Sequence, residues 1–77
     1  MEKDSEEIIK VTQKIKRYLN KHPHAADTSE GVVQWLAQQQ YEDSLKLVND
    51  ALEVLVEEQV VSKISLKDGT VIYRRFE

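Results

Sequence analysis

The C-terminal part of the chain carries a hairpin pattern that constrains the fold more than any other feature of the sequence. Two runs rich in β-branched and aromatic residues, residues 60–66 and 70–76, are separated by Lys67, Asp68 and Gly69. An Asp-Gly pair between two such runs is a strong short-range signal for a β-hairpin. Because an isolated two-stranded hairpin is marginally stable in water, these strands must pack against the chain that precedes them.

A two-residue loop of Asp68 and Gly69 predicts the register of this hairpin. One face then carries the apolar pairs Leu66 with Val71 and Ile64 with Tyr73. The other face carries Ser65 with Ile72 and Lys63 with Arg74. We expect the apolar face to pack on the core, since cross-strand apolar pairs stabilise a half-buried sheet.

Three amphipathic helices are expected before the hairpin, at about residues 4–21, 28–39 and 43–58, because apolar residues recur there at helical spacing. The first is capped by Asp4 with Glu7, or by Ser5 directly. Residues 27–30 offer a second capping box, with Asp27 as the N-cap. Pro23 ends the first helix, and residues 24–26 form a connector that can be extended.

The chain length of 77 residues predicts a single domain over residues 1–77. There is no cysteine, which agrees with a cytoplasmic location and removes disulfides and thiolate metal sites. No apolar run approaches the ~18 residues of a transmembrane helix, and residues 1–4 lack the apolar stretch of a signal peptide. We therefore expect a cytoplasmic protein that does not bind membranes.

Three helices followed by a hairpin resemble a winged helix, the helix-turn-helix variant in which the hairpin is called the wing. The resemblance is sharpest over residues 44–61, where one set of residues has the spacing found in many bacterial winged-helix proteins: Ser44, Val48, Leu52, Leu55, Val60 and Val61. Gln59 departs from the pattern, because Gly is usual where a helix ends in the left-handed conformation. The resemblance implies an α+β fold with a two-stranded antiparallel wing. Residues 22–32 read like a family-specific signature without an attached function.

Winged helices serve as DNA readers, interaction modules and dimerisation units, so the surface chemistry has to decide the function. The net charge of −3 is divided into +2 over residues 1–24, −7 over residues 25–58 and +2 over residues 59–77. On the third helix, one solvent face combines Lys46 with four carboxylates, those of Asp43, Asp50, Glu53 and Glu57. An acidic recognition helix opposes the approach of phosphates. This face is either a solvated surface or a surface for a basic partner.

Two further apolar residues of the third helix, Leu47 and Val54, lie outside its core stripe. They either widen the core or mark an interface with a second chain. On the first helix, a basic stripe consists of Lys10, Lys14, Arg17 and Lys21. The stripe is either solvated or docks on an acidic surface, such as the acidic helices of another copy.

The hairpin carries a second group of basic residues, Lys63, Lys67, Arg74 and Arg75. Such a group is typical of a wing that touches the DNA backbone. It is more commonly found on an exposed hairpin that charge protects from edge-to-edge aggregation, and we favour this interpretation.

The sequence contains no pattern that points to catalysis. His22, His24, Asp27 and Glu30 are residue types that bind zinc, but the chain has no third histidine and no cysteine to complete a set. There is no nucleophile with a neighbouring base and no glycine-rich phosphate loop. We expect neither an enzyme, nor a metal, nor a cofactor, nor a small-molecule substrate. Trp35, on an apolar helix face, is expected to anchor the core.

Two functions fit these observations. The first is a small non-catalytic module that binds a protein partner or a second copy of itself, as a homodimer. The alternative is a DNA-binding transcriptional regulator that contacts the duplex backbone through the basic wing and the first helix. The acidic third helix favours the first function.

Overall fold

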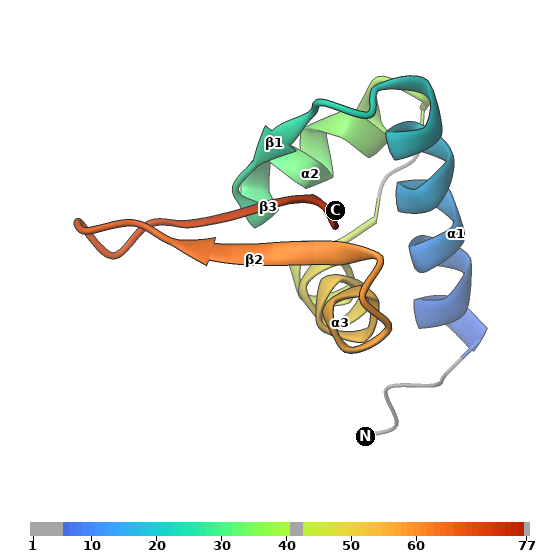
Figure 1. Ribbon diagram of the computed structural model, residues 1–77. Coiled ribbons are helices and arrows are strands. Elements are labelled where there is room, and N and C mark those ends of the chain that lie inside the picture. Colours follow the sequence, from blue (N-terminus) through green and yellow to red (C-terminus); the bar gives the residue numbers. More distant parts are fainter. Residues whose placement is uncertain (1–5, 41–42, 77) are drawn as a thin grey trace.

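The computed structural model describes residues 6–40 and 43–76, which form three helices and one three-stranded antiparallel sheet (Figure 1). In chain order the elements are α1 (Glu6–Lys21), β1 (Ala26–Asp27), α2 (Ser29–Ala37), α3 (Leu45–Glu57), β2 (Val61–Ser65) and β3 (Val71–Arg75). The predicted α+β class and the three predicted helices are confirmed. The predicted caps at Asp4 and Ser5 lie outside the described residues.

The core lies between the three helices and the base of the sheet, and the predicted helical faces supply most of it. Its buried residues are Ile8, Val11, Ile15 and Leu19 from α1, Val32, Trp35 and Leu36 from α2, Val48, Ala51, Leu52 and Leu55 from α3, and Val61 and Tyr73 from the sheet. The Trp35 side chain is buried, and its ring stacks on that of Tyr18 with 4.7 Å between centroids. The prediction that Trp35 anchors the core is confirmed.

The prediction that Asp27 caps the second helix is wrong, because Asp27 belongs to β1 and pairs with Tyr73. Thr28 is the N-cap of α2, and its Oγ1 accepts a hydrogen bond of 3.2 Å from the N–H of Gly31. The Asp27 carboxylate accepts a bond of 2.8 Å from the N–H of Thr28. Asp27 therefore belongs to the sheet, and the N-cap of α2 is the next residue, Thr28.

The C-terminus of α3 adopts the left-handed ending that the sequence pattern implies, although it lacks the usual glycine. Gln59 has a φ of 61°. The N–H of Gln59 bonds to the carbonyl of Val56 at 3.0 Å, and the N–H of Val60 bonds to the carbonyl of Leu55 at 2.9 Å. These two bonds define a Schellman motif, in which Gln59 occupies the position that glycine favours.

The sheet contains a third strand besides the two of the hairpin. β1 pairs antiparallel with β3, with Ala26 opposite Arg74, so the strand order is β1-β3-β2. The segment expected to be extended at residues 24–26 thus begins two residues later and joins the sheet. This segment adds a third strand to the two expected for the hairpin, and β2 lies at one edge of the sheet.

The predicted hairpin register is wrong by one residue. The predicted cross-strand pairs were Leu66–Val71, Ile64–Tyr73, Ser65–Ile72 and Lys63–Arg74. In the structure the pairs are Lys63–Tyr73, Ile64–Ile72 and Ser65–Val71. The cause is a three-residue loop, since the N–H of Leu66 bonds to the carbonyl of Thr70 at 2.8 Å. Gly69, with a φ of 91°, takes the left-handed position that such a loop requires.

This shift moves the side chains of β2 to the opposite face from the one expected, while Val71 and Tyr73 of β3 stay on the inner face, because successive strand residues point to opposite sides. The inner face carries the buried Val61 and Tyr73, and on it the Lys63 ammonium hydrogen-bonds to Glu53 of α3 at 3.2 Å. Ile64 and Leu66, which were expected on the core face, lie on the outer face instead.

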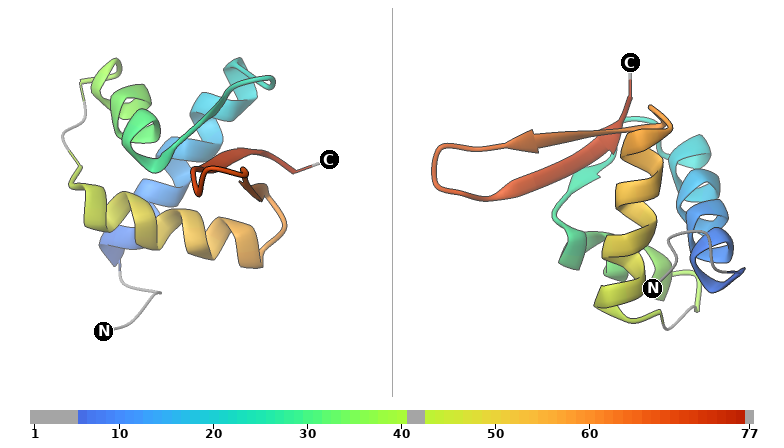
Figure 2. Two further views of the ribbon diagram at one scale, coloured as in Figure 1. Left: turned by 90° about the vertical axis from the view of Figure 1, so that its left-hand side faces the viewer. Right: turned by 90° about the horizontal axis from the view of Figure 1, so that it is seen from below.

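The distal part of the hairpin projects away from the helices, and α1 lies on the opposite side of the molecule from the hairpin tip (Figures 1 and 2). Among the residues that the structure describes, none of the helices combines the length and apolar composition that crossing a bilayer requires.

Candidate interaction surface

The outer face of the hairpin carries several exposed apolar side chains. We define the hairpin outer face by its four large apolar residues, Ile64, Leu66, Ile72 and Phe76. Ile64 and Ile72 are direct cross-strand partners. Phe76 continues the same face, because its N–H bonds to the carbonyl of Val60 at 2.9 Å and so extends the ladder.

These side chains are accessible to a partner. Leu66 retains 47% of its accessible surface, Phe76 43% and Ile64 36%, while Ile72 is half-buried. Ile64, Leu66 and Ile72 are neighbours on this face, whereas Ser62 and Arg74 separate Phe76 from them. Adjacent exposed apolar side chains, unlike scattered single ones, are a feature of interaction sites. The hairpin outer face is therefore the first candidate for binding another macromolecule.

The sequence did not predict the hairpin outer face, because the two-residue loop assumed for Asp68 and Gly69 places Ile64 and Leu66 on the core side. A signal was available, since Lys67, Asp68 and Gly69 also fit a three-residue loop with glycine at the left-handed position. The Asp68 carboxylate accepts a bond of 2.9 Å from the N–H of Thr70, which reinforces this loop and lowers the pKa of Asp68.

The acidic residues predicted to form a surface on α3 are largely paired within the chain. Asp50 accepts a bond of 3.3 Å from Lys46, one turn before it. Glu53 accepts the bond from Lys63, and this hydrogen bond raises the pKa of the Lys63 ammonium. Glu57 is exposed near the C-terminus of α3. The exposed face of α3 thus remains acidic, but two of its carboxylates are engaged by lysines.

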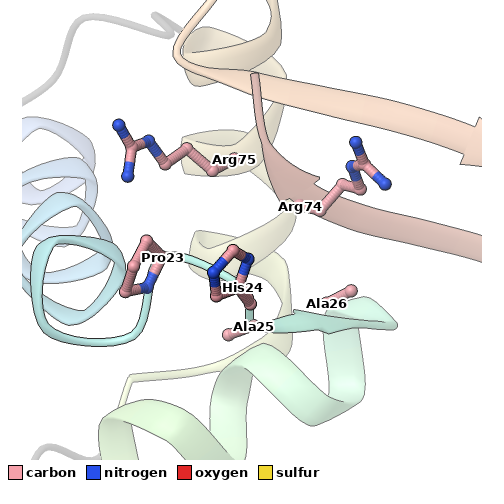
Figure 3. A pocket seen from close by; sticks show the side chains of 6 residues that line it. All are labelled: Pro23, His24, Ala25, Ala26, Arg74 and Arg75. Atoms are coloured by element: carbon pink, nitrogen blue, oxygen red, sulfur yellow. The ribbon is translucent and has the colours of Figure 1, made fainter. Parts of the chain in front are cut away.

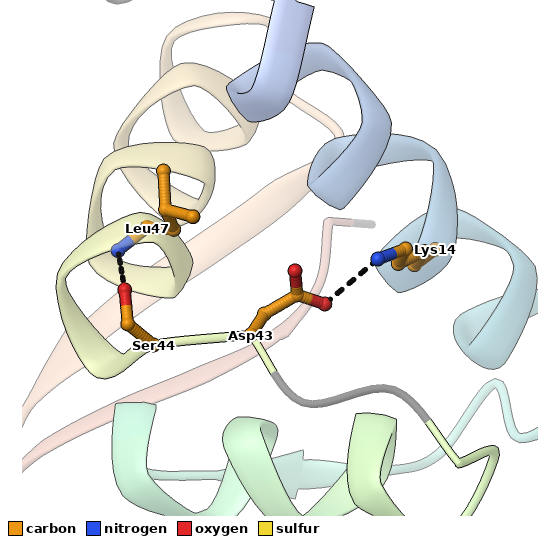
Figure 4. Close-up of polar contacts among 4 residues, drawn as sticks. All are labelled: Lys14, Asp43, Ser44 and Leu47. Atoms are coloured by element: carbon orange, nitrogen blue, oxygen red, sulfur yellow. Dashed lines mark hydrogen bonds and ion pairs between the residues drawn. The ribbon is translucent and has the colours of Figure 1, made fainter.

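Asp43 does not lie on this exposed face. It precedes α3, and its carboxylate forms an ion pair of 2.9 Å with Lys14 of the basic stripe on α1 (Figure 4). Beside it, the Ser44 hydroxyl caps α3 by accepting a bond of 3.2 Å from the N–H of Leu47. The rest of the predicted stripe, namely Lys10, Arg17 and Lys21, is exposed.

Leu47 and Val54 are half-buried, and both pack against the hydrophobic core. This packing supports the interpretation that they widen the core. Contact with a second chain through these two residues stays a prediction.

The basic residues of the hairpin do not form one cluster. Lys63 points inward to Glu53, and Lys67 is exposed at the tip. Arg74 lies opposite Ser62 on the outer face, so the predicted juxtaposition of Lys63 and Arg74 is wrong. Arg74 and the exposed Arg75 lie near the other end of β3, at the base of the hairpin.

A hollow of about 300 Å³ adjoins these two arginines (Figure 3). It is lined by Pro23, His24, Ala25, Ala26, Arg74 and Arg75. Its lining combines two guanidinium groups with one imidazole and contains no carboxylate, which is chemistry suited to an anion. In Figure 3 the two guanidinium groups extend to different sides of His24, so they flank the hollow without converging at one point.

The residues considered for a metal are distributed over separate local structures. The imidazole of His22 packs against the ring of Tyr18, with 4.5 Å between centroids, and His24 lines the hollow. Asp27 bonds to the backbone of Thr28. Within residues 6–40 and 43–76, no group of three or more His, Cys, Asp or Glu residues is arranged to hold a metal ion.

Comparison of the chain with protein-family models, with curated proteins and with solved structures finds no match in any of the three.

Proposed function

We propose that this chain is a small winged-helix module without catalytic activity, and that it binds another protein chain through the hairpin outer face. One observation carries the proposal: Ile64 and Leu66 are exposed side by side on a projecting hairpin, although both are large and apolar. Covering such residues removes apolar surface from water, which is the main favourable term in most protein association.

The solvent-facing side of α3 also favours protein binding, because its charge disfavours DNA binding. In DNA-binding winged helices this helix enters the major groove. Here the half-buried Asp50 and Glu53 and the exposed Glu57 are acidic, and Lys46 is already bonded to Asp50. Because phosphate neutralisation supplies most non-specific DNA affinity, this helix is poorly suited to the groove.

Site-specific photo-crosslinking in the cells that make the protein tests the proposal. A photoreactive phenylalanine analogue replaces Leu66 in one variant and Lys46, on the exposed face of α3, in a matched control variant. We expect a protein adduct from position 66 and none from position 46. Adducts from position 46 alone, or from neither position, would overturn the proposed surface.

Contact with a duplex backbone is the second candidate function, and the basic hollow is the observation that favours it. His24, Arg74 and Arg75 line that hollow without an acidic neighbour in the lining. If this function is correct, duplex DNA binds at low salt, the affinity falls steeply as salt rises, and Arg75→Glu weakens binding. Absence of duplex binding at low salt would eliminate this candidate.

A further inference from the structure

One edge of the sheet remains open along β2. The strand order β1-β3-β2 leaves β2 with a neighbour on one side only. Backbone hydrogen bonds join Leu66 to Thr70 and Phe76 to Val60, so alternate residues of β2 direct their backbone groups at β3. By the same alternation, Lys63 and Ser65 direct their N–H and carbonyl groups at the open side.

β2 carries only one of the usual devices that protect an edge strand. Natural edges are blocked by proline, by bulges or by charged side chains, including charged side chains that point inward. Residues 60–66 contain no proline, and their one charged residue, Lys63, points inward, where its ammonium is paired with the carboxylate of Glu53. On the outer face this segment presents Ser62, Ile64 and Leu66, all uncharged. An accessible backbone edge therefore adjoins an apolar surface.

We infer that the occupant of this edge is a second copy of the chain, whose own β2 adds antiparallel to the first and extends the sheet across a two-fold axis. The inference rests on the proposed function and names the partner. It is a form of strand addition, in which backbone hydrogen bonds supply affinity and the side chains select the register.

The charge of Lys63 disfavours the register that pairs this residue with its own copy. Hydrogen-bonded pairs must join residues whose backbone groups face the open side, which on this strand include Lys63 and Ser65. Pairing Lys63 with the second copy's Lys63 would place like charges opposite each other, which destabilises a sheet. A register in which the partner strand is shifted by two residues pairs Lys63 with the second copy's Ser65 and avoids this repulsion.

The register that pairs Lys63 with the second copy's Ser65 also aligns the apolar side chains. It places Ile64 opposite the second copy's Ile64, on the outer face of both hairpins. Because Ile64 already pairs with Ile72 within each chain, four isoleucines form one continuous row across the joined sheet. Cross-strand pairs of β-branched residues of this kind stabilise a sheet. The strand β2 is thus complementary to itself in hydrogen bonding, in charge and in apolar pattern.

Amide hydrogen exchange of the wild-type chain tests this inference, together with the sedimentation mass over a dilution series. From about 10 μM to about 1 mM we expect the mass to rise toward that of a dimer. Over the same range the Lys63 and Ser65 amides should gain protection by about tenfold or more, because pairing removes them from water. The Ile64 amide, which faces β3 in each chain, is the internal control and should change far less.

A proline scan of the edge provides the matched variants. Ser65→Pro removes an N–H that faces the open side and leaves the ladder with β3 intact, since proline is tolerated at such positions. Ser65→Ala keeps the N–H and serves as the control. We expect Ser65→Pro to abolish the concentration-dependent mass and Ser65→Ala to preserve it. If Ser65→Pro does not fold, the wild-type exchange data decide alone.

The outcomes separate this inference from the proposed function. A chain that stays monomeric at about 1 mM overturns the inference, and so does a dimer whose Lys63 and Ser65 amides stay unprotected. A monomer that still crosslinks from position 66 to a different protein leaves the proposed function standing. A monomer without any adduct from position 66 overturns both.

Discussion

The Lys14 ammonium lies 2.9 Å from the Asp43 carboxylate, and this ion pair ties α1 to the segment that leads into α3. The two side chains retain only 21% and 15% of their accessible surface, so the pair is more shielded than the pairs of Lys16 with Glu58, Lys46 with Asp50 and Lys63 with Glu53. A basic residue of α1 and an acidic residue near α3, each of which suggests an external partner on its own, satisfy each other within one chain.

A double-mutant cycle measures this interaction. We expect Lys14→Ala and Asp43→Ala to be coupled by about 1 kcal/mol in the free energy of unfolding, because shielding from water weakens the screening of the pair. The matched cycle on Lys46 and Asp50, in which the lysine side chain is 75% exposed, should give about 0.3 kcal/mol. Urea unfolding supplies all the values, and a coupling for the first pair no larger than for the second would contradict the expectation.

Replacement of Gln59 by glycine should stabilise the protein. Gln59 has a φ of 61°, a conformation that costs a residue with a Cβ about 1 kcal/mol and costs glycine nothing in steric terms. We expect Gln59→Gly to raise the free energy of unfolding by about 1 kcal/mol, measured by urea denaturation. Gln59→Ala, which keeps the Cβ, is the control and should bring no such gain. Equal stability of the two variants would rule out the left-handed helix end.

Gly31 should be intolerant of a methyl group even though it lies in a helix. A Cβ at this position would overlap the carboxylate of Asp27, which is held by its hydrogen bond to the N–H of Thr28. We expect Gly31→Ala to lower the free energy of unfolding by about 1 kcal/mol, which outweighs the helical preference for alanine. Asp27→Ala in the same chain removes the overlap. The double variant should therefore be destabilised less than the sum of the two single variants, and strict additivity would argue against the contact.

The hairpin loop should respond to acid through Asp68. Its carboxylate accepts the N–H of Thr70, which lowers the pKa of Asp68 below its ordinary value of 3.8. A lowered pKa in the folded state gives stability that is complete above the ordinary value and is lost as the pH falls through the folded value. We expect an NMR titration of the Asp68 carboxyl carbon to have its midpoint below 3.8. Asp68→Asn, which retains the acceptor but does not titrate, should lack this component of acid destabilisation.

The helices could be predicted closely from the sequence because their signals are local. The apolar spacing of residues such as Ile8, Val11 and Ile15 identifies a helix and its buried face together, and all three are buried. The Ser44 cap was likewise within the predicted start of α3. The left-handed end at Gln59 lies where the resemblance to winged helices predicts one, even though this chain lacks the glycine that usually marks it.

The candidate surface could not be predicted because it depends on one residue of loop length. A two-residue loop and a three-residue loop both fit the segment around Asp68 and Gly69, yet they send Ile64 to opposite faces. The ion pair of Lys14 with Asp43 and the hollow between His24 and Arg75 join residues that are distant in sequence. No local pattern indicates such pairs, since they form only when the helices and the sheet pack.

The hairpin register decides whether Ile64 and Leu66 face a partner or the core, so its direct measurement tests the account most sharply. Pairs that are not hydrogen-bonded bring the two Cα atoms to about 4.5 Å, which gives strong contacts between α protons in NOE spectra. We expect such cross-peaks between Lys63 and Tyr73 and between Ser65 and Val71. Cross-peaks that instead pair Ile64 with Tyr73 would return Ile64 to the inner face and contradict the proposed surface.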